Sequence, residues 1–273
     1  MKDPTWYSDA PEPRGEIRAT AWPRILLKGI ALFTLVFGGL ALLLALRLIE
    51  RPIHGIARPW TPHITVFVCR GALRIIGLRR HETGTQMSGH GAIVANHVSW
   101  LDIFTLNAAG PIYFVSKSEV AGWPGIGWLA RATGTVFVKR DRRQAAHQVA
   151  MFQNRLAAGH TLAFFPEGTS TDGRQVLPFK PTLFAAFLQG ASPRIQPVTL
   201  SYQAPAGKDA RFYGWWGDMD FGPHLLATLA AKRQGTVRVI YRDPVNARDF
   251  ANRKTLAMAM ENTVRDGLTA HQN

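Results

Sequence analysis

The chain has 273 residues, enough for one large domain or two small ones, and its hydrophobic content of 47% is sufficient for a core. Its 32 Lys and Arg residues against 18 Asp and Glu give a formal net charge of +14, which favours a polyanionic neighbour, either nucleic acid or an anionic membrane surface. A single cysteine, Cys69, excludes an intrachain disulfide and a cysteine-based zinc site.

Residues 1–22 are polar, with two closely spaced prolines, and lack the basic-then-apolar order of a cleaved signal peptide, so we expect a flexible tail. The stretch 29–46 that follows carries no charge and is bracketed by basic residues. About 20 apolar residues span a bilayer as a helix, and long basic side chains at its ends can reach the headgroups. The apolar segment 25–50 therefore predicts a membrane-embedded helix, which either crosses the bilayer or dips into one leaflet.

A second apolar segment, residues 63–80, is interrupted by Arg70 and Arg74, which share one face of a helix. Such a pattern is typical of an amphipathic helix in the membrane interface, and equally of an amphipathic core helix. Residues 23–80 are thus expected to be membrane-anchoring helices, followed by an α/β domain over 81–273. Contact with anionic headgroups explains the net charge, and no basic-aromatic array indicates a nucleic-acid module.

Basic residues behind the first apolar run favour the cytoplasmic side of the inner membrane for the rest of the chain, although the tail is basic too.

From about residue 90, short apolar runs alternate with helical patterns. Strands are predicted over residues 91–96, 112–117, 134–140, 161–167, 195–202 and 236–245. Helices are predicted over 141–159, over 181–190 and from about 248 to the end. The alternation predicts an α/β fold with a mainly parallel or mixed sheet flanked by helices.

The stretch VANHVSWLDI (94–103) closes the first of these strands. His97 is expected in the turn, with Ser99 as the helix N-cap and Asp102 in the first helical turn. Sites in open α/β sheets gather beyond the carboxyl ends of strands. A carboxylate beside an imidazole fixes its tautomer and raises its basicity, so that His97 could accept a proton from an incoming hydroxyl.

Other roles compete for this motif. A serine hydrolase would need an exposed nucleophile, but the chain has no G-x-S-x-G elbow. A metal site would need further ligands, and His81 and His90 stand at no recognisable spacing, so no metal is expected. A histidine that merely caps a loop is the structural alternative.

Four ordered blocks resemble the glycerolipid acyltransferase family typified by bacterial lysophosphatidate acyltransferase. NHVSWLD (96–102) is similar to its H-x4-D block, and SKSEVAGWPGIGWLARATGTVFVKR (116–140) to its second block. FPEGTS (165–170) is similar to the third block and QPVTL (196–200) to the fourth. The resemblance implies acyl transfer from acyl carrier protein or coenzyme A to a lysolipid hydroxyl, without a cofactor, a metal or a covalent acyl-enzyme.

The resemblance also implies roles for single residues. His97 would be the general base and Asp102 its partner. The substrate-binding set that it implies is Lys117, Arg140, Glu167, Gly168, Thr169 and Ser170. In this set the two cations would hold an anionic headgroup, and the glutamate and glycine would shape the acceptor pocket.

One departure from the family bears on the acceptor. The third block usually reads FPEGTRS, with an arginine expected on the acceptor phosphate, whereas this chain has Ser170. Serine cannot replace bidentate guanidinium contact to a phosphate. The stretch 164–186 is more similar to the branch that acylates lyso-ornithine lipids, whose headgroup carries a carboxylate and an ammonium. Asp218 and Asp220 could meet that ammonium, or lie in a solvated loop.

A lyso-ornithine-type aminolipid is therefore the favoured acceptor. The first alternative is a 1-acyl-sn-glycerol-3-phosphate acyltransferase that makes phosphatidic acid. A non-catalytic lipid-binding protein on the same scaffold is the alternative from another class, although such a protein has no need of a base.

Overall fold

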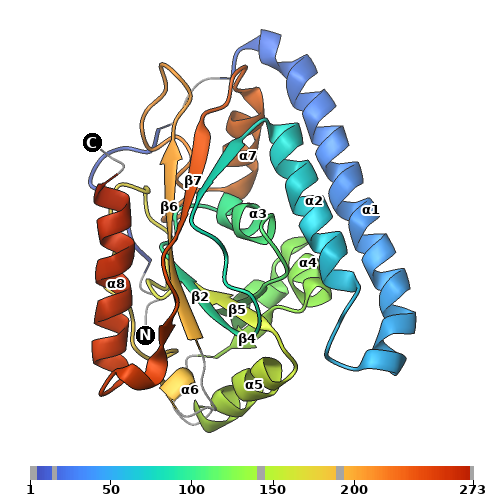
Figure 1. Cartoon of the computed structure of the whole chain (residues 1–273). Helices are drawn as coiled ribbons and strands as arrows, with labels where there is room; N and C mark the ends of the chain where they lie inside the picture. Colours follow the sequence, from blue (N-terminus) through green and yellow to red (C-terminus); the bar gives the residue numbers. More distant parts are fainter. Residues whose placement is uncertain (1–4, 14–16, 140–144, 189–193, 271–273) are drawn as a thin grey trace.

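A mixed sheet of eight strands carries the fold in a computed structural model that describes residues 5–13, 17–139, 145–188 and 194–270 (Figure 1). The strands are β1 (Arg79–Thr83), β2 (Gly91–Ala95), β3 (Tyr113–Lys117), β4 (Val136–Val138), β5 (Thr161–Phe164), β6 (Arg194–Gln203), β7 (Thr236–Tyr241) and β8 (Val245–Asn246). Their order is β1-β7-β6-β2-β5-β3-β4, with β8 on β6. β6 is antiparallel to β7 and β8, and the other pairs are parallel. The expected α/β fold is confirmed.

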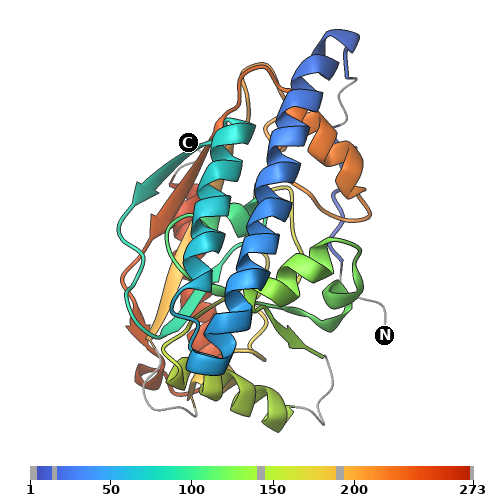
Figure 2. The same cartoon turned by 90° about the vertical axis from the view of Figure 1, so that its right-hand side faces the viewer.

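Helices cover both faces of the sheet. They are α1 (Trp22–His54), α2 (Thr61–Ile76), α3 (Leu101–Asn107), α4 (Ile126–Thr133), α5 (Ala145–Ala157), α6 (Ala185–Leu188), α7 (Phe221–Ala230) and α8 (Arg253–Thr269). Helices α5, α6 and α8 pack on one face, and α3 packs on the other with α2 and α1 behind it (Figures 1 and 2). Strand β2, which leads into the candidate site, therefore lies between two layers of helices.

Burial on both faces explains why the central strands read as continuous apolar runs. All five residues of β2 are buried. Ala92 and Val94 point into the core shared with α5 and α8, whereas Ile93 and Ala95 point towards α3. Side chains alternate across a strand, so a parallel strand covered on both sides has no polar face.

Helix α2 is shorter than its apolar pattern suggested. It ends at Ile76 because Gly77 adopts a left-handed conformation (φ 89°) and donates its N–H to the carbonyl of Leu73. Arg79 and Arg80, expected in the helix, begin β1 instead and pair with β7. The predicted strand 236–245 is likewise divided into β7 and β8.

Helices α1 and α2 run antiparallel and pack closely (Figures 1 and 2). A Cβ on Gly39 would lie 2.4 Å from a methyl group of Val68, and one on Gly71 would lie 2.7 Å from a methyl group of Leu35. The opposite face of α2 packs on α3, and the Nε of Arg70 donates to the carbonyl of Ala108 at 2.7 Å. Helix α2 is therefore an amphipathic helix packed on the body of the protein.

Both ends of α1 are bonded to the same body. Near its start, Arg24 donates to the carbonyl of Ala230 and Lys28 to that of Ile76. Near its end, the carboxylate of Glu50 accepts the N–H and the hydroxyl of Thr61, at 3.0 and 2.6 Å. The helix thus lies along the body over its whole length.

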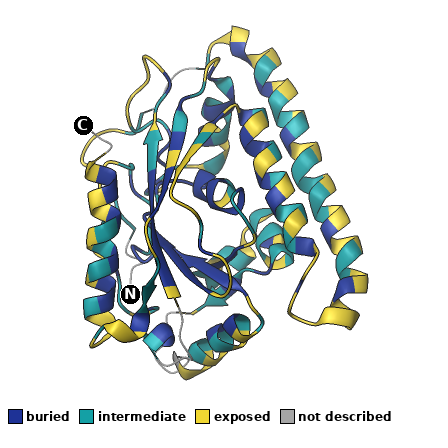
Figure 3. Ribbon diagram, in the orientation of Figure 1, coloured by how far each residue is buried: buried dark blue, intermediate teal, exposed yellow. Residues whose placement is uncertain are grey.

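The outward side of α1 is apolar and exposed (Figure 3). Its exposed large side chains are Trp22, Leu26, Leu27, Ile30, Phe33, Leu42, Leu44, Leu48, Ile49 and Ile53. Within the part of the chain that the structure describes, the segment Ala19–His54 is the one helix long and apolar enough to cross a membrane. Monomeric soluble proteins rarely expose apolar patches of this extent.

Candidate active site

The imidazole of His97 and the carboxylate of Asp102 are in direct contact. The Nδ1 of His97 lies 2.8 Å from the Oδ2 of Asp102. His97 follows β2, and Asp102 lies in the first turn of α3. The side chain of His97 is 22% exposed and that of Asp102 is fully buried. Because Nδ1 faces the carboxylate, Nε2 is the ring nitrogen left to face a substrate.

Asp102 also organises the turn that carries His97. Its Oδ2 accepts the backbone N–H groups of Val98 and Ser99, at 2.7 and 3.0 Å. The prediction that Ser99 caps the helix is wrong, because Trp100 is the N-cap residue and no side chain caps the helix. The N–H of Asp102 donates to the backbone carbonyl of Ser99 and not to its hydroxyl. The buried hydroxyl of Ser99 has no hydrogen-bond partner among the described residues.

The second oxygen of Asp102 is bound from β6, the strand beside β2. The hydroxyl of Tyr202 donates to Oδ1 at 2.8 Å and lies 3.2 Å from the hydroxyl oxygen of Thr105. Burial, together with the neighbouring carboxylate, raises the pKa of Tyr202 well above its ordinary value, so the phenol keeps its proton. Tyr202 was not among the residues that the sequence indicated.

The turn after β5 meets the His97 turn from the side. The ring of Phe165 stacks on the His97 imidazole, with centroids 4.1 Å apart and planes 9° apart. Glu167 is 1% exposed, and its two oxygens accept the backbone N–H groups of His97 and Leu177, at 2.7 and 2.8 Å. Burial raises the pKa of Glu167 to about 8, although both backbone donors oppose this shift. Glu167 therefore ties the turn of His97 to the segment of Leu177.

The side chain of a lysine approaches Gly168 in the turn after β5. Gly168 has φ 73°, and a Cβ there would lie 2.6 Å from the Nζ of Lys180. Only glycine fits that backbone conformation and that space at once. The close approach brings a cation to the turn that sequence reasoning missed, because Lys180 lies twelve residues further along the chain.

Thr169 and Ser170 bind other parts of the protein. The Oγ of Ser170 donates to the carbonyl of Trp215 at 2.5 Å, and the Oγ1 of Thr169 accepts the N–H of Trp6 at 3.3 Å. The position at which the family carries an arginine thus fastens the loop that contains Trp215. Trp215 in turn donates its N–H to the carbonyl of Val98 at 2.9 Å, next to His97.

The beginning of the chain also lies on this loop, although residues 1–22 were expected to form a flexible tail. The Trp6 and Trp216 rings pack edge to face with centroids 6.0 Å apart. The Tyr7 hydroxyl donates to Asp218 at 3.0 Å. Trp216 is 4% exposed and belongs to the interior, whereas Asp218 and Asp220 are exposed.

The headgroup cations expected from the sequence fall at the same edge of the sheet. Lys117 ends β3, which is parallel to β5, and β5 is parallel to β2, so their carboxyl ends lie on the side of His97. Arg140 lies outside the described residues. The sheet therefore brings Lys117 to the edge that carries His97 and the Glu167 turn.

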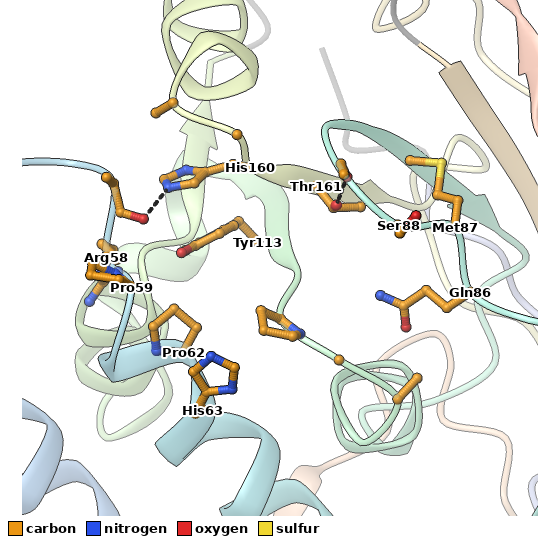
Figure 4. Close-up of a pocket in the computed structure, with 17 residues that line it drawn as sticks. Arg58, Pro59, Pro62, His63, Gln86, Met87, Ser88, Tyr113, His160 and Thr161 are labelled. Atoms are coloured by element: carbon orange, nitrogen blue, oxygen red, sulfur yellow. Dashed lines mark hydrogen bonds between the residues drawn. The ribbon is translucent and has the colours of Figure 1, made fainter.

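A separate pocket of about 420 Å³ lies at the opposite edge of the sheet, at the amino ends of β2 and β5 (Figure 4). His160 points into it, stacks on Tyr113 with centroids 4.0 Å apart, and lies 3.2 Å through Nε2 from the carbonyl of Ala57. Burial lowers the pKa of His160 to about 4. Arg58 also binds across this region, donating to the carbonyl of Ala132. These contacts fasten the loop between α1 and α2, and the pocket contains none of the predicted site residues.

The arrangement around His97 fits proton transfer. A partly exposed imidazole is oriented by a buried, fully bonded carboxylate and lies beyond the carboxyl end of a central strand. The outer nitrogen can accept a proton from an alcohol, and Glu167 and the backbone of Trp215 bind the turn that carries it.

Comparison with known proteins agrees with this geometry. A family model described as Acyltransferase matches residues 77–201. A lyso-ornithine lipid O-acyltransferase from Rhodobacter capsulatus is 54% identical over 271 residues, which cover 98% of both chains. A 1-acyl-sn-glycerol-3-phosphate acyltransferase from Neisseria meningitidis is 31% identical over 175 residues, 63% of this chain and 67% of that one. The crystal structure of the 1-acyl-sn-glycerophosphate (LPA) acyltransferase PlsC from Thermotoga maritima has the same fold, with a TM-score of 0.66 at 20% identity, covering 92% of this chain and 98% of that one.

Proposed function

The chain belongs to the acyltransferase family, and we propose that it transfers a fatty acyl group from a thioester of acyl carrier protein or coenzyme A to the hydroxyl of a lysolipid, with lyso-ornithine lipid as the favoured acceptor. The observation that carries the proposal is the 2.8 Å contact between His97 Nδ1 and Asp102 Oδ2, which holds an imidazole ready to act as a base.

The proposed reaction needs one base and good positioning. Nε2 of His97 takes the hydroxyl proton of the acceptor as its oxygen attacks the thioester carbonyl. The tetrahedral intermediate then expels the thiolate, which takes the proton back from the imidazolium. A thioester is already activated, so a positioned base and an oriented acceptor suffice, and no acyl-enzyme is needed.

The preference for lyso-ornithine lipid depends on the residue in the arginine's place. Ser170 there is bonded to the carbonyl of Trp215, so this position offers no cation to a dianionic phosphate. A carboxylate carries one charge and is a suitable partner for Lys117, Arg140 and Lys180. The ammonium of the headgroup would meet Asp218, which lies on the rim of the loop. The 54% identity to a lyso-ornithine lipid O-acyltransferase supports the same choice.

Acceptor competition tests the proposal. Purified enzyme is given lyso-ornithine lipid and lysophosphatidate separately and together, with acyl carrier protein thioester and then with acyl-coenzyme A. We expect faster acylation of lyso-ornithine lipid. Turnover of lysophosphatidate alone would replace the proposal with phosphatidic acid synthesis, the function named for the Neisseria meningitidis relative.

We further propose that the protein lies on the cytoplasmic face of the inner membrane, with α1 embedded along one leaflet. Bonds at both ends of α1 support this arrangement. Arg24 binds the carbonyl of Ala230 at the end of α7, and the loop after α1 is tied to the α/β domain by bonds from Arg58 and His160. A helix that crossed the bilayer would have to separate those ends by the full membrane thickness. Exposed Trp123 and Trp128 beside α4 extend the apolar surface, and tryptophan favours the membrane interface.

Cysteine labelling tests this orientation. Cys69 is buried, so cysteines introduced singly at Arg24 and Arg51 report on their own positions. With a membrane-impermeant maleimide, both should react in inverted inner-membrane vesicles and neither in intact spheroplasts. Reaction of the two positions from opposite sides would mean that α1 crosses the bilayer.

A further inference from the structure

Tyr202 approaches the catalytic pair from outside the motif that contains it. Its hydroxyl lies 2.8 Å from Asp102 Oδ1, and no other hydrogen-bond donor reaches that oxygen within the described part of the chain. Oδ2 by contrast receives His97 and two backbone N–H groups. One oxygen of the carboxylate therefore depends on one side chain of β6.

The direction of the proton in this contact is fixed by chemistry. A carboxylate has no proton to donate, so Tyr202 must be the donor to Asp102. The hydroxyl of Thr105, 3.2 Å from the tyrosine oxygen and fully buried, is then left to donate to Tyr202. Thr105, Tyr202, Asp102 and His97 thus form one chain of hydrogen bonds that ends at the reacting nitrogen.

We propose that Tyr202 is a positioning residue of the acyl transfer, whose hydroxyl holds the Asp102 carboxylate and sets how strongly it supports a positive charge on His97. The inference rests on the proposed function of His97 as the base. A donor on Oδ1 draws negative charge away from Oδ2, and the imidazole bonded to Oδ2 then binds its proton less tightly. The hydroxyl would therefore keep His97 unprotonated, and able to act as a base, down to a lower pH.

A merely structural role makes a different prediction. The Tyr202 ring packs against Tyr213 with centroids 5.6 Å apart, and loss of such packing would affect stability alone. Tyr202→Phe keeps the ring and removes only the hydroxyl. Tyr241→Phe is the matched control, because it removes a buried tyrosine hydroxyl of the same sheet, bonded to Arg80 at 3.0 Å.

The test is the pH dependence of kcat/KM for acyl transfer. In Tyr202→Phe we expect kcat/KM near pH 7 to fall about tenfold, the lower end of what one hydrogen bond to a charged group contributes. The acid limb of the profile should move to higher pH, because the less solvated carboxylate holds the imidazolium more tightly. Tyr241→Phe should retain the wild-type profile.

Replacing Tyr202 with 3-fluorotyrosine gives a second reading that does not remove any atom of the network. Fluorine makes the phenol a stronger donor, so the acid limb should move to lower pH, opposite to its movement in Tyr202→Phe. A structural role cannot produce shifts of opposite sign.

The outcomes separate this inference from the proposed function. Wild-type rates and an unmoved acid limb in both folded Tyr202 variants would overturn the role of Tyr202 while His97→Ala is inactive. Full activity of His97→Ala would overturn the proposed base itself. Thr105→Val, which leaves the tyrosine–aspartate contact intact, should shift the limb in the same direction as Tyr202→Phe but by less.

Discussion

The surroundings of Asp102 and the outward face of α1 differ in what is exposed to solvent: a charge is buried in the first, and apolar side chains are exposed in the second. Asp102 is a charged group with no exposed surface, and protein donors satisfy both of its oxygens. On α1, Leu27 and Leu48 are apolar groups that are 73% and 79% exposed, with no protein partner to cover them. Burying a charge is tolerated only with full hydrogen bonding, and exposing leucine is unfavourable in water. The first region is therefore complete within the protein, whereas the second is not, and we propose that a lipid phase covers it.

The largest expected effect is the loss of acyl-transfer activity when His97 or Asp102 is replaced. His97→Ala should lower kcat about 10²–10⁴-fold, the usual contribution of a positioned general base. Asp102→Asn should be similarly damaging, because the amide carries no charge to orient the imidazole, and its NH2 group must face either the N–H groups of Val98 and Ser99 or the hydroxyl of Tyr202. Single-turnover rates with saturating acceptor are the measurement, and circular dichroism checks the fold. Near-normal rates in a folded His97→Ala protein would favour the lipid-binding alternative.

The next largest effect is expected when charged residues are introduced on the exposed apolar face of α1. Wild-type protein should stay with membranes through a high-salt wash, because apolar burial is not screened by salt. The double variant Leu27→Glu, Leu48→Glu loses the burial of two leucines, about 3 kcal/mol or more, which is about a hundredfold in membrane partitioning. Flotation with lipid vesicles measures it.

The control for that experiment is Met258→Glu on α8, which replaces an exposed apolar residue on the far side of the sheet. It should float like the wild type. Equal flotation of the wild type, the double leucine variant and Met258→Glu would show that α1 is not the membrane-binding surface.

The buried carboxyl of Glu167 should make the free energy of unfolding depend on pH. Its pKa is raised from about 4.5 to about 8 by burial, so the folded protein retains a proton that the unfolded chain has already released. The stabilising contribution of this group is complete below pH 4.5 and is lost as the pH rises through 8, with a slope of at most about 1.4 kcal/mol per pH unit. Urea unfolding at pH 5 to 8 should show a steeper decline in the wild type than in Glu167→Gln. Parallel slopes in the two proteins would contradict a buried, protonated Glu167.

The smallest expected effects are changes in thermal stability at the contact between α1 and α2. In Gly39→Ala the new methyl group would collide with Val68, and such overpacking costs about 1–3 kcal/mol. Gly38→Ala has open space around it and should gain up to about 1 kcal/mol from helix propensity. Thermal unfolding in detergent should therefore move the two neighbouring variants in opposite directions. Two equal shifts would mean that the helices do not approach as closely at Gly39.

The sequence was most informative where spacing along the chain determines geometry. His97 and Asp102 are five residues apart at the end of a buried strand, and a strand–turn–helix unit brings such residues together without outside help. The family resemblance and the α/β fold, both confirmed, depend on the same kind of ordered local signals.

The sequence was least informative where neighbours come from distant strands. Tyr202 lies 100 residues from Asp102 and meets it only because β6 pairs with β2, which no local pattern encodes. β1 was missed because RRHET has no apolar alternation, being a largely exposed edge strand. The cap predicted at Ser99 failed for a local reason, since the helix begins one residue later and the backbone carbonyl of Ser99, not its hydroxyl, accepts the N–H of Asp102.

The contact between Trp6 and Thr169 joins residues 163 positions apart and sets an order of events during synthesis. The ribosome releases Trp6 and the whole of α1 well before Thr169 and Trp216 exist. In the proposed arrangement, α1 reaches the bilayer while Trp6 still has nothing to dock on. Trp6 can therefore take its place against Thr169 and Trp216 only after most of the α/β domain has been synthesised.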